Sequence, residues 1–219
     1  DDYRCAALKN LTRVRFFAVQ NLTREKQRFM NQLFKKYSMM TQEKVFSDTF
    51  STTALAVYES FESTETLANM DLHQLTEFII EKGKNRFPAP DFVAKAIQKT
   101  AQSFYRLPKT VNDSVNQMLS ISVNSMRAME SQIKAFDKAI AEQMALIPNT
   151  LTSVNGIGPV YSAGIIAEIG DINRFPNQAS LAKYVGLVWS QHQSGDFEAQ
   201  NTRMIQSGNR YLKYYLCEA

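Results

Sequence analysis

The sequence contains little cysteine, glycine or proline, and it has no long uninterrupted apolar run. Its 219 residues include two cysteines, eight glycines and six prolines, which argues against a low-complexity chain. Cys5 and Cys217 stand at opposite ends without the spacing of a metal site, so we interpret both as buried free thiols in a reducing compartment. Because neither a signal peptide nor a run of about 18 apolar residues occurs, we expect no membrane partner and a cytoplasmic protein.

The composition is that of a folded chain. Hydrophobic residues make up 44% and charged residues 21%, enough to bury a core in two domains or in one elongated helical domain. The sequence opens on Asp1 and Asp2 rather than methionine and ends while a helical pattern is still running. We therefore expect an internal piece of a longer protein.

Basic charge is concentrated at the amino-terminal end. Residues 1–40 carry nine Lys or Arg against three acids, residues 41–150 carry eleven against thirteen, and residues 151–219 carry five of each. Residues 4–38 contain neither Gly nor Pro and predict one long helix, in which one face packs while the other meets a polyanion. A solvated helix face explains such a pattern about equally well. The basic residues that we expect to contact nucleic acid on this helix are Arg13, Arg24, Lys26 and Arg28.

The middle of the chain predicts a small helical subdomain that contains no evident site. His73 has no second metal ligand at helical spacing, so we interpret it as structural. Asp71 is expected to cap one of the helices. The predicted helices span residues 42–50, 54–58, 65–70, 71–82 and 91–104.

Residues 112–147 predict one long helix with a coiled-coil seam. Apolar residues recur every seven positions, and polar Ser122 and Gln143 weaken the seam. Its partner is either the basic first helix, folded back as an antiparallel hairpin, or the same helix in another subunit. The weak seam favours pairing within the chain, with some contact in a homo-oligomer. The heptad residues are Leu119, Met126, Ile133, Ile140 and Ile147.

A glycine-rich hairpin follows Pro148. The sequence Asn155-Gly156-Ile157-Gly158, followed by a small-residue helix, is typical of a helix-hairpin-helix. Glycines allow bare N–H groups at the start of a helix to approach a phosphate, so Gly156, Ile157 and Gly158 are candidate nucleic-acid contacts. An ordinary helix-turn-helix corner without a ligand is the alternative.

Five sequence blocks then occur in an order that resembles a known family. The blocks are Asn155-Gly156-Ile157-Gly158-Pro159, Phe175, Leu181-Ala182-Lys183-Tyr184-Val185-Gly186-Leu187, Ser194-Gly195, and Gly208-Asn209-Arg210-Tyr211-Leu212-Lys213. Together they resemble the carboxy-terminal transposase domain of the IS110 family of insertion-sequence transposases. The resemblance is strongest over residues 150–219. It divides the chain into a helical linker and coiled-coil region, residues 1–148, and a transposase domain, residues 149–219, in a mainly α-helical fold.

The resemblance implies a DNA recombinase that moves a mobile element under the guidance of an RNA. It also implies a prokaryotic, nucleoid-associated protein. Family members carry a RuvC-like domain that binds magnesium, which this chain lacks, so we expect neither a cofactor nor a metal in this piece and little catalysis by it alone. The implied serine nucleophile is best matched by Ser194. His192, Arg203 and Arg210 are possible helpers, and Lys213 a further nucleic-acid contact.

Other interpretations stay open. Ser190 and Ser207 are alternative nucleophiles, whereas Tyr214 and Tyr215 lie among leucines and are interpreted as packing residues. The chain is alternatively a nucleic-acid-binding module without chemistry, or a helical interaction protein built on the heptad helix. The second alternative predicts a stable oligomer without affinity for nucleic acid at low salt.

Overall fold

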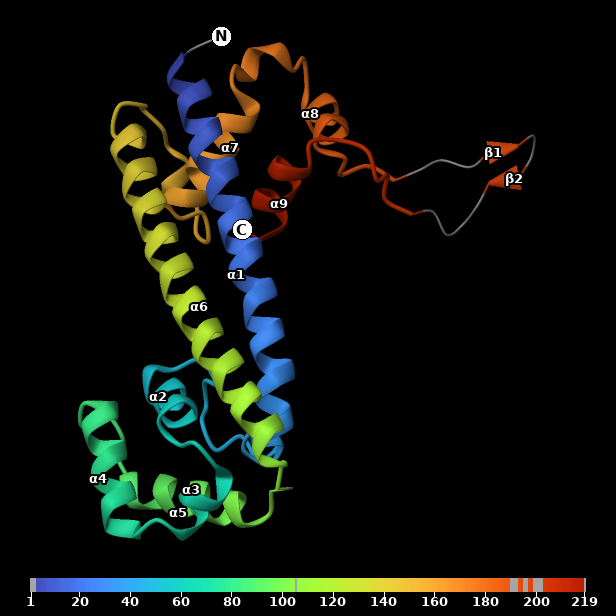
Figure 1. Ribbon diagram of the computed structural model, residues 1–219. Helices are drawn as coiled ribbons and strands as arrows, with labels where there is room; N and C mark the ends of the chain where they lie inside the picture. Colours follow the sequence, from blue (N-terminus) through green and yellow to red (C-terminus); the bar gives the residue numbers. More distant parts are fainter. Residues whose placement is uncertain (1–2, 105, 190–192, 195–196, 199–202, 219) are drawn as a thin grey trace. The chain divides into compact units, whose positions relative to one another are not determined.

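The computed structural model describes residues 3–104, 106–189, 193–194, 197–198 and 203–218 and confirms a mainly α-helical fold (Figure 1). Within these described residues, the strands form one antiparallel pair of two-residue segments, in which Gln193 lies opposite Glu198 and Ser194 opposite Phe197. The helices are α1 (Tyr3–Gln42), α2 (Thr52–Ser60), α3 (Thr64–Asn69), α4 (Leu72–Gly83), α5 (Pro90–Gln102), α6 (Lys109–Met144), α7 (Pro159–Ile169), α8 (Gln178–Val185) and α9 (Arg210–Glu218), with 3-10 turns η1 (Leu151–Ser153) and η2 (Ile172–Arg174) and strands β1 (Gln193–Ser194) and β2 (Phe197–Glu198).

The chain forms two compact units. Unit 1 comprises Asp1–Gln20 and Ser131–Ala219, and unit 2 comprises Asn21–Glu130. Helices α1 and α6 contribute residues to both units. These units differ from the two sequence segments expected above, whose boundary after residue 148 stays a prediction.

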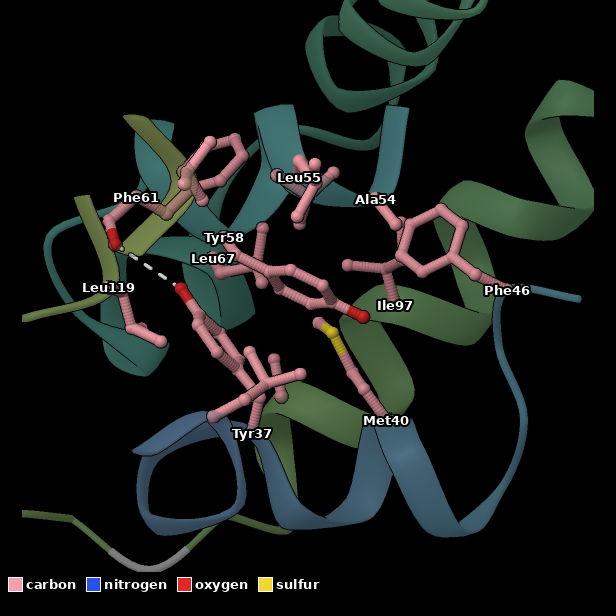
Figure 2. Close-up of a cluster of buried hydrophobic side chains, with 14 of the residues drawn as sticks. Tyr37, Met40, Phe46, Ala54, Leu55, Tyr58, Phe61, Leu67, Ile97 and Leu119 are labelled. Atoms are coloured by element: carbon pink, nitrogen blue, oxygen red, sulfur yellow. Dashed lines mark hydrogen bonds between the residues drawn. The ribbon is translucent and has the colours of Figure 1, made fainter. Parts of the chain in front are cut away.

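Unit 2 is built around a large aromatic and aliphatic core. The α1 residues Phe29, Leu33 and Tyr37 pack with Leu119 and Met126 of α6, and α2–α5 close the cluster. Figure 2 shows the Tyr37 hydroxyl donating to the Phe61 carbonyl, at 3.2 Å, inside this cluster. The bond satisfies a buried polar group, so the chain path after α2 is fixed against α1.

In unit 2, the predicted cap at Asp71 is confirmed and one predicted helix is wrong. Asp71 accepts hydrogen bonds from two backbone N–H groups at the start of α4, which confirms the predicted cap. The predicted helix over residues 42–50 is wrong, because residues 43–50 form turns and bends. There the Asp48 carboxylate accepts a hydrogen bond from the Phe50 N–H at 2.8 Å. The backbone carbonyl of Asp48 accepts a second one from the Ser51 N–H. These local bonds compete with helical ones and deliver the chain to Ser51, the N-cap of α2.

The predicted pairing of the heptad helix with the first helix is confirmed. In unit 2, Leu119 and Met126 pack against α1, and the buried Ser122 hydroxyl donates to Glu25 at 2.6 Å. In unit 1, Ile140 packs with Leu8, and Arg15 pairs with Asp137. Residue numbers fall along α6 as they rise along α1, so the pairing is antiparallel. Ile133 and Ile147 of the predicted seam are only partly buried.

Unit 1 contains two smaller clusters that share helix α7. Its Ala163 and Ala167 pack on Leu8 and Ile140, whereas Ile165 packs on α8 and α9. Gly164 is required here, because a Cβ at this position would lie 2.2 Å from the Tyr215 ring. Helices α7 and α9 therefore approach closely only without a side chain at residue 164.

The end of α8 meets the start of α9 through two glycines. Gly186 ends α8 at φ +85° and Gly208 precedes α9 at φ +119°, both in the left-handed region. A Cβ on Gly186 would lie 2.1 Å from the Ser207 carbonyl oxygen, and one on Gly208 would lie 2.7 Å from the Gly186 nitrogen. Glycine at both positions lets these two backbone segments touch.

Candidate nucleic-acid interface

A buried carboxylate, Glu168, lies at the centre of unit 1. Its side chain is 0% exposed and accepts two hydrogen bonds from Arg13, at 2.6 and 2.9 Å. The Lys9 ammonium lies 3.6 Å away, and the Asn209 amide donates to the same carboxylate at 2.8 Å. The bidentate geometry and the third donor supply the compensation that a buried charge requires. Helices α1, α7 and α9 are thus held together by one carboxylate.

The electrostatics of this pair follow from its partners. Burial raises the pKa of Glu168, but hydrogen bonds from Arg13 and Asn209 and the charges of Arg13 and Lys9 hold the net pKa below its ordinary value. The pKa of Arg13 is raised chiefly by its hydrogen bonds to Glu168. Glu168 is therefore ionised and saturated with donors, so it is a structural anion rather than a base available to a substrate.

Asn209 connects this carboxylate to a tyrosine. Its amide also contacts the Tyr184 hydroxyl at 3.1 Å, while its carbonyl oxygen accepts from the first N–H groups of α9. Burial raises the pKa of Tyr184, but Asn209 and Arg174 lower it to a net value below the ordinary one. The Arg174 guanidinium lies 4.6 Å from the centre of the Tyr184 ring and at the same distance from the Phe175 ring. We call Lys9, Arg13, Glu168, Tyr184 and Asn209 the Glu168 cluster.

Two open cavities flank the Glu168 cluster, and both have cations in their walls. One, of about 410 Å³, is lined by Arg13, Arg210, Tyr184, Tyr211, Gly208 and Asn209. The other, of about 610 Å³, lies beside Lys9, Arg174 and the end of α7. The first cavity combines cationic and aromatic side chains, which suit a phosphate backbone and stacked bases, whereas the second has no aromatic residue among its described lining residues and includes the carboxylates of Glu168 and Asp171.

Ser194 belongs to the segment between Trp189 and Met204, which we call the excursion. Its base is closed where Trp189 bridges Met204 and the Ile205 N–H donates to the Val188 carbonyl at 2.9 Å. Within the excursion, β1 pairs with β2, and Ser194 is the last residue of β1. Ser190 and His192, also candidates, lie outside the described residues.

The predicted carboxy-terminal cations occupy different environments. Lys213 donates to the carbonyls of Gly186 and Ile205, at 3.1 and 3.4 Å, so its ammonium ties α9 to the base of the excursion. Arg210 is exposed and stacks 4.8 Å from the Tyr211 ring centre, beside the 410 Å³ cavity. Arg203 lies next to the bridge at Met204. Only Arg210 therefore has an exposed head group at a cavity wall.

The four basic residues predicted on the first helix are divided between the two units. Arg13 belongs to unit 1 and is engaged by Glu168, whereas the other three belong to unit 2. Lys26 pairs with Glu130 at 3.7 Å, and Arg28 pairs with Glu25 at 3.2 Å. Arg24 is exposed and its side chain contacts Asn21 at 3.4 Å. Their contacts with nucleic acid stay predictions, with Arg24 and Arg28 the most accessible.

The glycine hairpin is exposed, but its first helix is not shown. A single 3-10 turn, η1, precedes it, and Gly156 turns the chain at φ +94°. Ile157 packs against the cluster in which Ile165 of α7 meets α8 and α9. Gly158 is the N-cap of α7. A Cβ on Gly158 would meet nothing within 4 Å, so the start of α7 is open to a ligand. Phosphate binding there stays a prediction.

Comparison with known proteins identifies the carboxy-terminal segment. Residues 149–219 match the Transposase IS116/IS110/IS902 family. This segment is therefore similar to IS116/IS110/IS902 transposases. Its relatives include the insertion element IS110 uncharacterized 43.6 kDa protein of Streptomyces coelicolor, which is 37% identical over 87 residues, or 40% of this chain. The chain spans about a fifth of the length of that relative (20%). No solved structure matches the chain.

The sequence blocks of the transposase domain serve mainly to assemble it. The block 181–187 supplies Tyr184 and Gly186, and the block 208–213 supplies Gly208, Asn209 and Lys213, all of which make the contacts described above. Residues separated by more than twenty positions are thereby brought to the base of the excursion.

Sequence reasoning missed Glu168 and Asn209. Glu168 is the one charged residue in the apolar run 164–169, and that position was the available signal. Cys217 is exposed rather than buried, and Cys5 is half-buried. Within the described ranges, no three His, Cys, Asp or Glu side chains are grouped as a metal site would need. A search of the same ranges finds no helix with the length and apolarity to cross a membrane.

Proposed function

We propose that this chain is part of a transposase that cuts and rejoins DNA of a mobile element, with Ser194 as the nucleophile. The observation that carries the proposal is the match of residues 149–219 to the transposase family, because this segment contains Ser194 and its blocks 181–187 and 208–213 meet at the base of the excursion. The serine mechanism, a guide RNA, DNA as substrate and a homo-oligomeric assembly all belong to the proposal.

The proposed step is a transesterification. The Ser194 oxygen forms a bond to a DNA phosphorus, the bond from phosphorus to the 3′ oxygen breaks, and that oxygen takes the serine proton through a base. The product is a 5′-phosphoserine and a free 3′ hydroxyl. Because one ester replaces another, the reverse reaction with a second 3′ hydroxyl rejoins DNA without an energy source.

We assign the positive charge that this step requires to residues beside the base of the excursion. Arg210 is exposed beside the 410 Å³ cavity and is suited to stabilise the negative charge on the pentavalent phosphorus. Lys213 acts as a positioning residue, because its ammonium already bonds two carbonyls at the base of the excursion. Magnesium would be held by a RuvC-like domain outside this chain and would supply further charge at the reacting phosphate.

The test is a covalent adduct assay. The chain is joined to its upstream domain, supplied with the cognate RNA and DNA, and denatured before electrophoresis. We expect a protein–DNA adduct in wild type and in the Ser190→Ala and Ser207→Ala controls, and none in Ser194→Ala. An adduct that survives in Ser194→Ala would overturn the assignment of the nucleophile. Tight binding without any adduct would favour a binding module without chemistry.

A further inference from the structure

Unit 2, which the sequence predicted to contain no site, has a cavity surrounded by cations. The cavity measures about 650 Å³ and lies between the chain that follows α1, the start of α2 and the chain that joins α4 to α5. Among the described residues that line it there is no carboxylate. Its cations are Lys44, Lys82, Lys84 and Arg86.

Three of these cations have free head groups. Lys82 pairs with Glu81 at 2.7 Å, but within the described part of the chain no ion pair or hydrogen bond engages the side chain of Lys44, Lys84 or Arg86. All three are exposed. Like charges held around one hollow repel each other, and a bound polyanion relieves that repulsion. The residues Thr52 and Thr53, at the positive end of the α2 dipole, line the same hollow.

The backbone places two of the lysines in an unusual conformation. Lys44 has φ +49° and Lys84 has φ +51°, in the left-handed region that glycine and asparagine adopt more readily. Gly83, one residue earlier, does not take this role. It is needed because a Cβ there would lie 2.6 Å from the Phe87 ring. A lysine therefore ends α4 where a smaller residue is usual, and its ammonium remains at the cavity.

Aromatic side chains lie beside the cations. Phe92 lines the cavity and is 72% exposed, whereas Phe46 lines it from the buried core. An exposed aromatic face costs hydration free energy unless a partner covers it, and a nucleic-acid base has a matching flat face. Bases in a duplex are already stacked on their neighbours, so an unpaired base fits Phe92 best.

We propose that this cavity binds a single-stranded nucleic acid, with Lys44, Lys84 and Arg86 on consecutive phosphates and a base stacked on Phe92. We call these four residues the unit 2 site. RNA and DNA share this chemistry, so the experiment must separate them. The proposal goes beyond the function proposed for the transposase domain and requires no chemistry at Ser194.

The experiment measures fluorescence anisotropy of the 219-residue chain with labelled oligonucleotides of about 20 nucleotides over a range of KCl concentrations. Single-stranded RNA, single-stranded DNA and duplex DNA are compared, with anionic lipid vesicles as a further arm. The test variant combines Lys44→Asn, Lys84→Asn and Arg86→Gln, because asparagine tolerates the left-handed conformation. The matched control removes three exposed cations of unit 2 that lie outside the cavity: Lys35→Gln, Lys99→Gln and Lys109→Gln.

We expect the test variant to lower the slope of log affinity against log salt by about 2, since each phosphate contact on a single strand contributes about 0.7. The control triple should leave the slope nearly unchanged. Phe92→Leu should weaken single-strand binding by about 5- to 100-fold while leaving the slope and duplex binding unchanged. The stronger of the RNA and DNA arms identifies the ligand.

Several results would overturn the proposal. They are an absence of single-strand binding by wild type, equal losses in the test and control triples, or binding of vesicles rather than oligonucleotides through the same residues. Circular dichroism of each variant distinguishes lost binding from lost folding. A missing serine adduct with intact single-strand binding would refute only the chemistry at Ser194.

Discussion

Replacing Arg13 with methionine should destabilise unit 1 by leaving the Glu168 carboxylate buried without its main partner. Methionine keeps the apolar stem of the side chain and removes the two charged hydrogen bonds. Breaking a buried ion pair from one side costs about 3–5 kcal/mol. Because Arg13 is 38% exposed and Lys9 and Asn209 remain, we expect the lower end, about 3 kcal/mol.

The loss should depend on pH in a defined direction. In wild type the pKa of Glu168 is lowered, so its stabilising contribution is present above the ordinary carboxyl pKa and is lost as the pH falls through the folded-state value. In Arg13→Met the effect of burial is less opposed, so Glu168 takes up a proton at higher pH and loses its buried charge. The difference between the two proteins should therefore shrink on acidification.

Urea unfolding, followed by hydrogen exchange of α7 and α9 amides, measures the effect in unit 1. The matched control is Arg28→Met on the same helix, where the ion pair to Glu25 is exposed on the arginine side and contributes less than about 1 kcal/mol. Adding Glu168→Gln to Arg13→Met should recover at least about 1 kcal/mol. A loss below about 1 kcal/mol in Arg13→Met, or a loss that is unchanged at low pH, would refute the reasoning.

Two further substitutions test the packing of each unit. Gly164→Ala should destabilise unit 1 by about 1–3 kcal/mol in urea unfolding, because its Cβ would lie 2.2 Å from the Tyr215 ring. The control Gly158→Ala should destabilise it by less than about 1 kcal/mol. Equal effects of the two substitutions would contradict the close packing of α7 on α9. Burial lowers the pKa of Lys36 to about 8, so above that pH the unfolded chain binds more protons than the folded chain. The free energy of unfolding of unit 2 should therefore rise by about 2 kcal/mol between about pH 8 and about pH 9.5. Lys36→Met should abolish this rise, as measured by urea unfolding at each pH. A rise that persists in Lys36→Met would assign the pH dependence to another titratable group.

Most helices could be predicted from local sequence because their signals are local. Residues 4–38 lack glycine and proline, Asp71 is a strong N-cap, and the heptad spacing of α6 marks its buried face. The prediction failed at residues 42–50, where Asp48 bonds to nearby backbone groups and prevents helix formation. The outcome there depended on a competition between similar local energies, which composition does not resolve.

The sequence by itself determined the mainly helical fold, the pairing face of α6 and the transposase blocks, since each depends on residue order and spacing. Only the tertiary structure decided which residues meet. Arg13 and Glu168 are 155 positions apart and only folding pairs them, while the predicted contact of Arg13 with nucleic acid stays a prediction. The same is true of the cavity in unit 2, because residues 44 and 84 carry no shared signal along the chain. Charge clusters of this kind arise from packing, which brings distant side chains within a few ångströms.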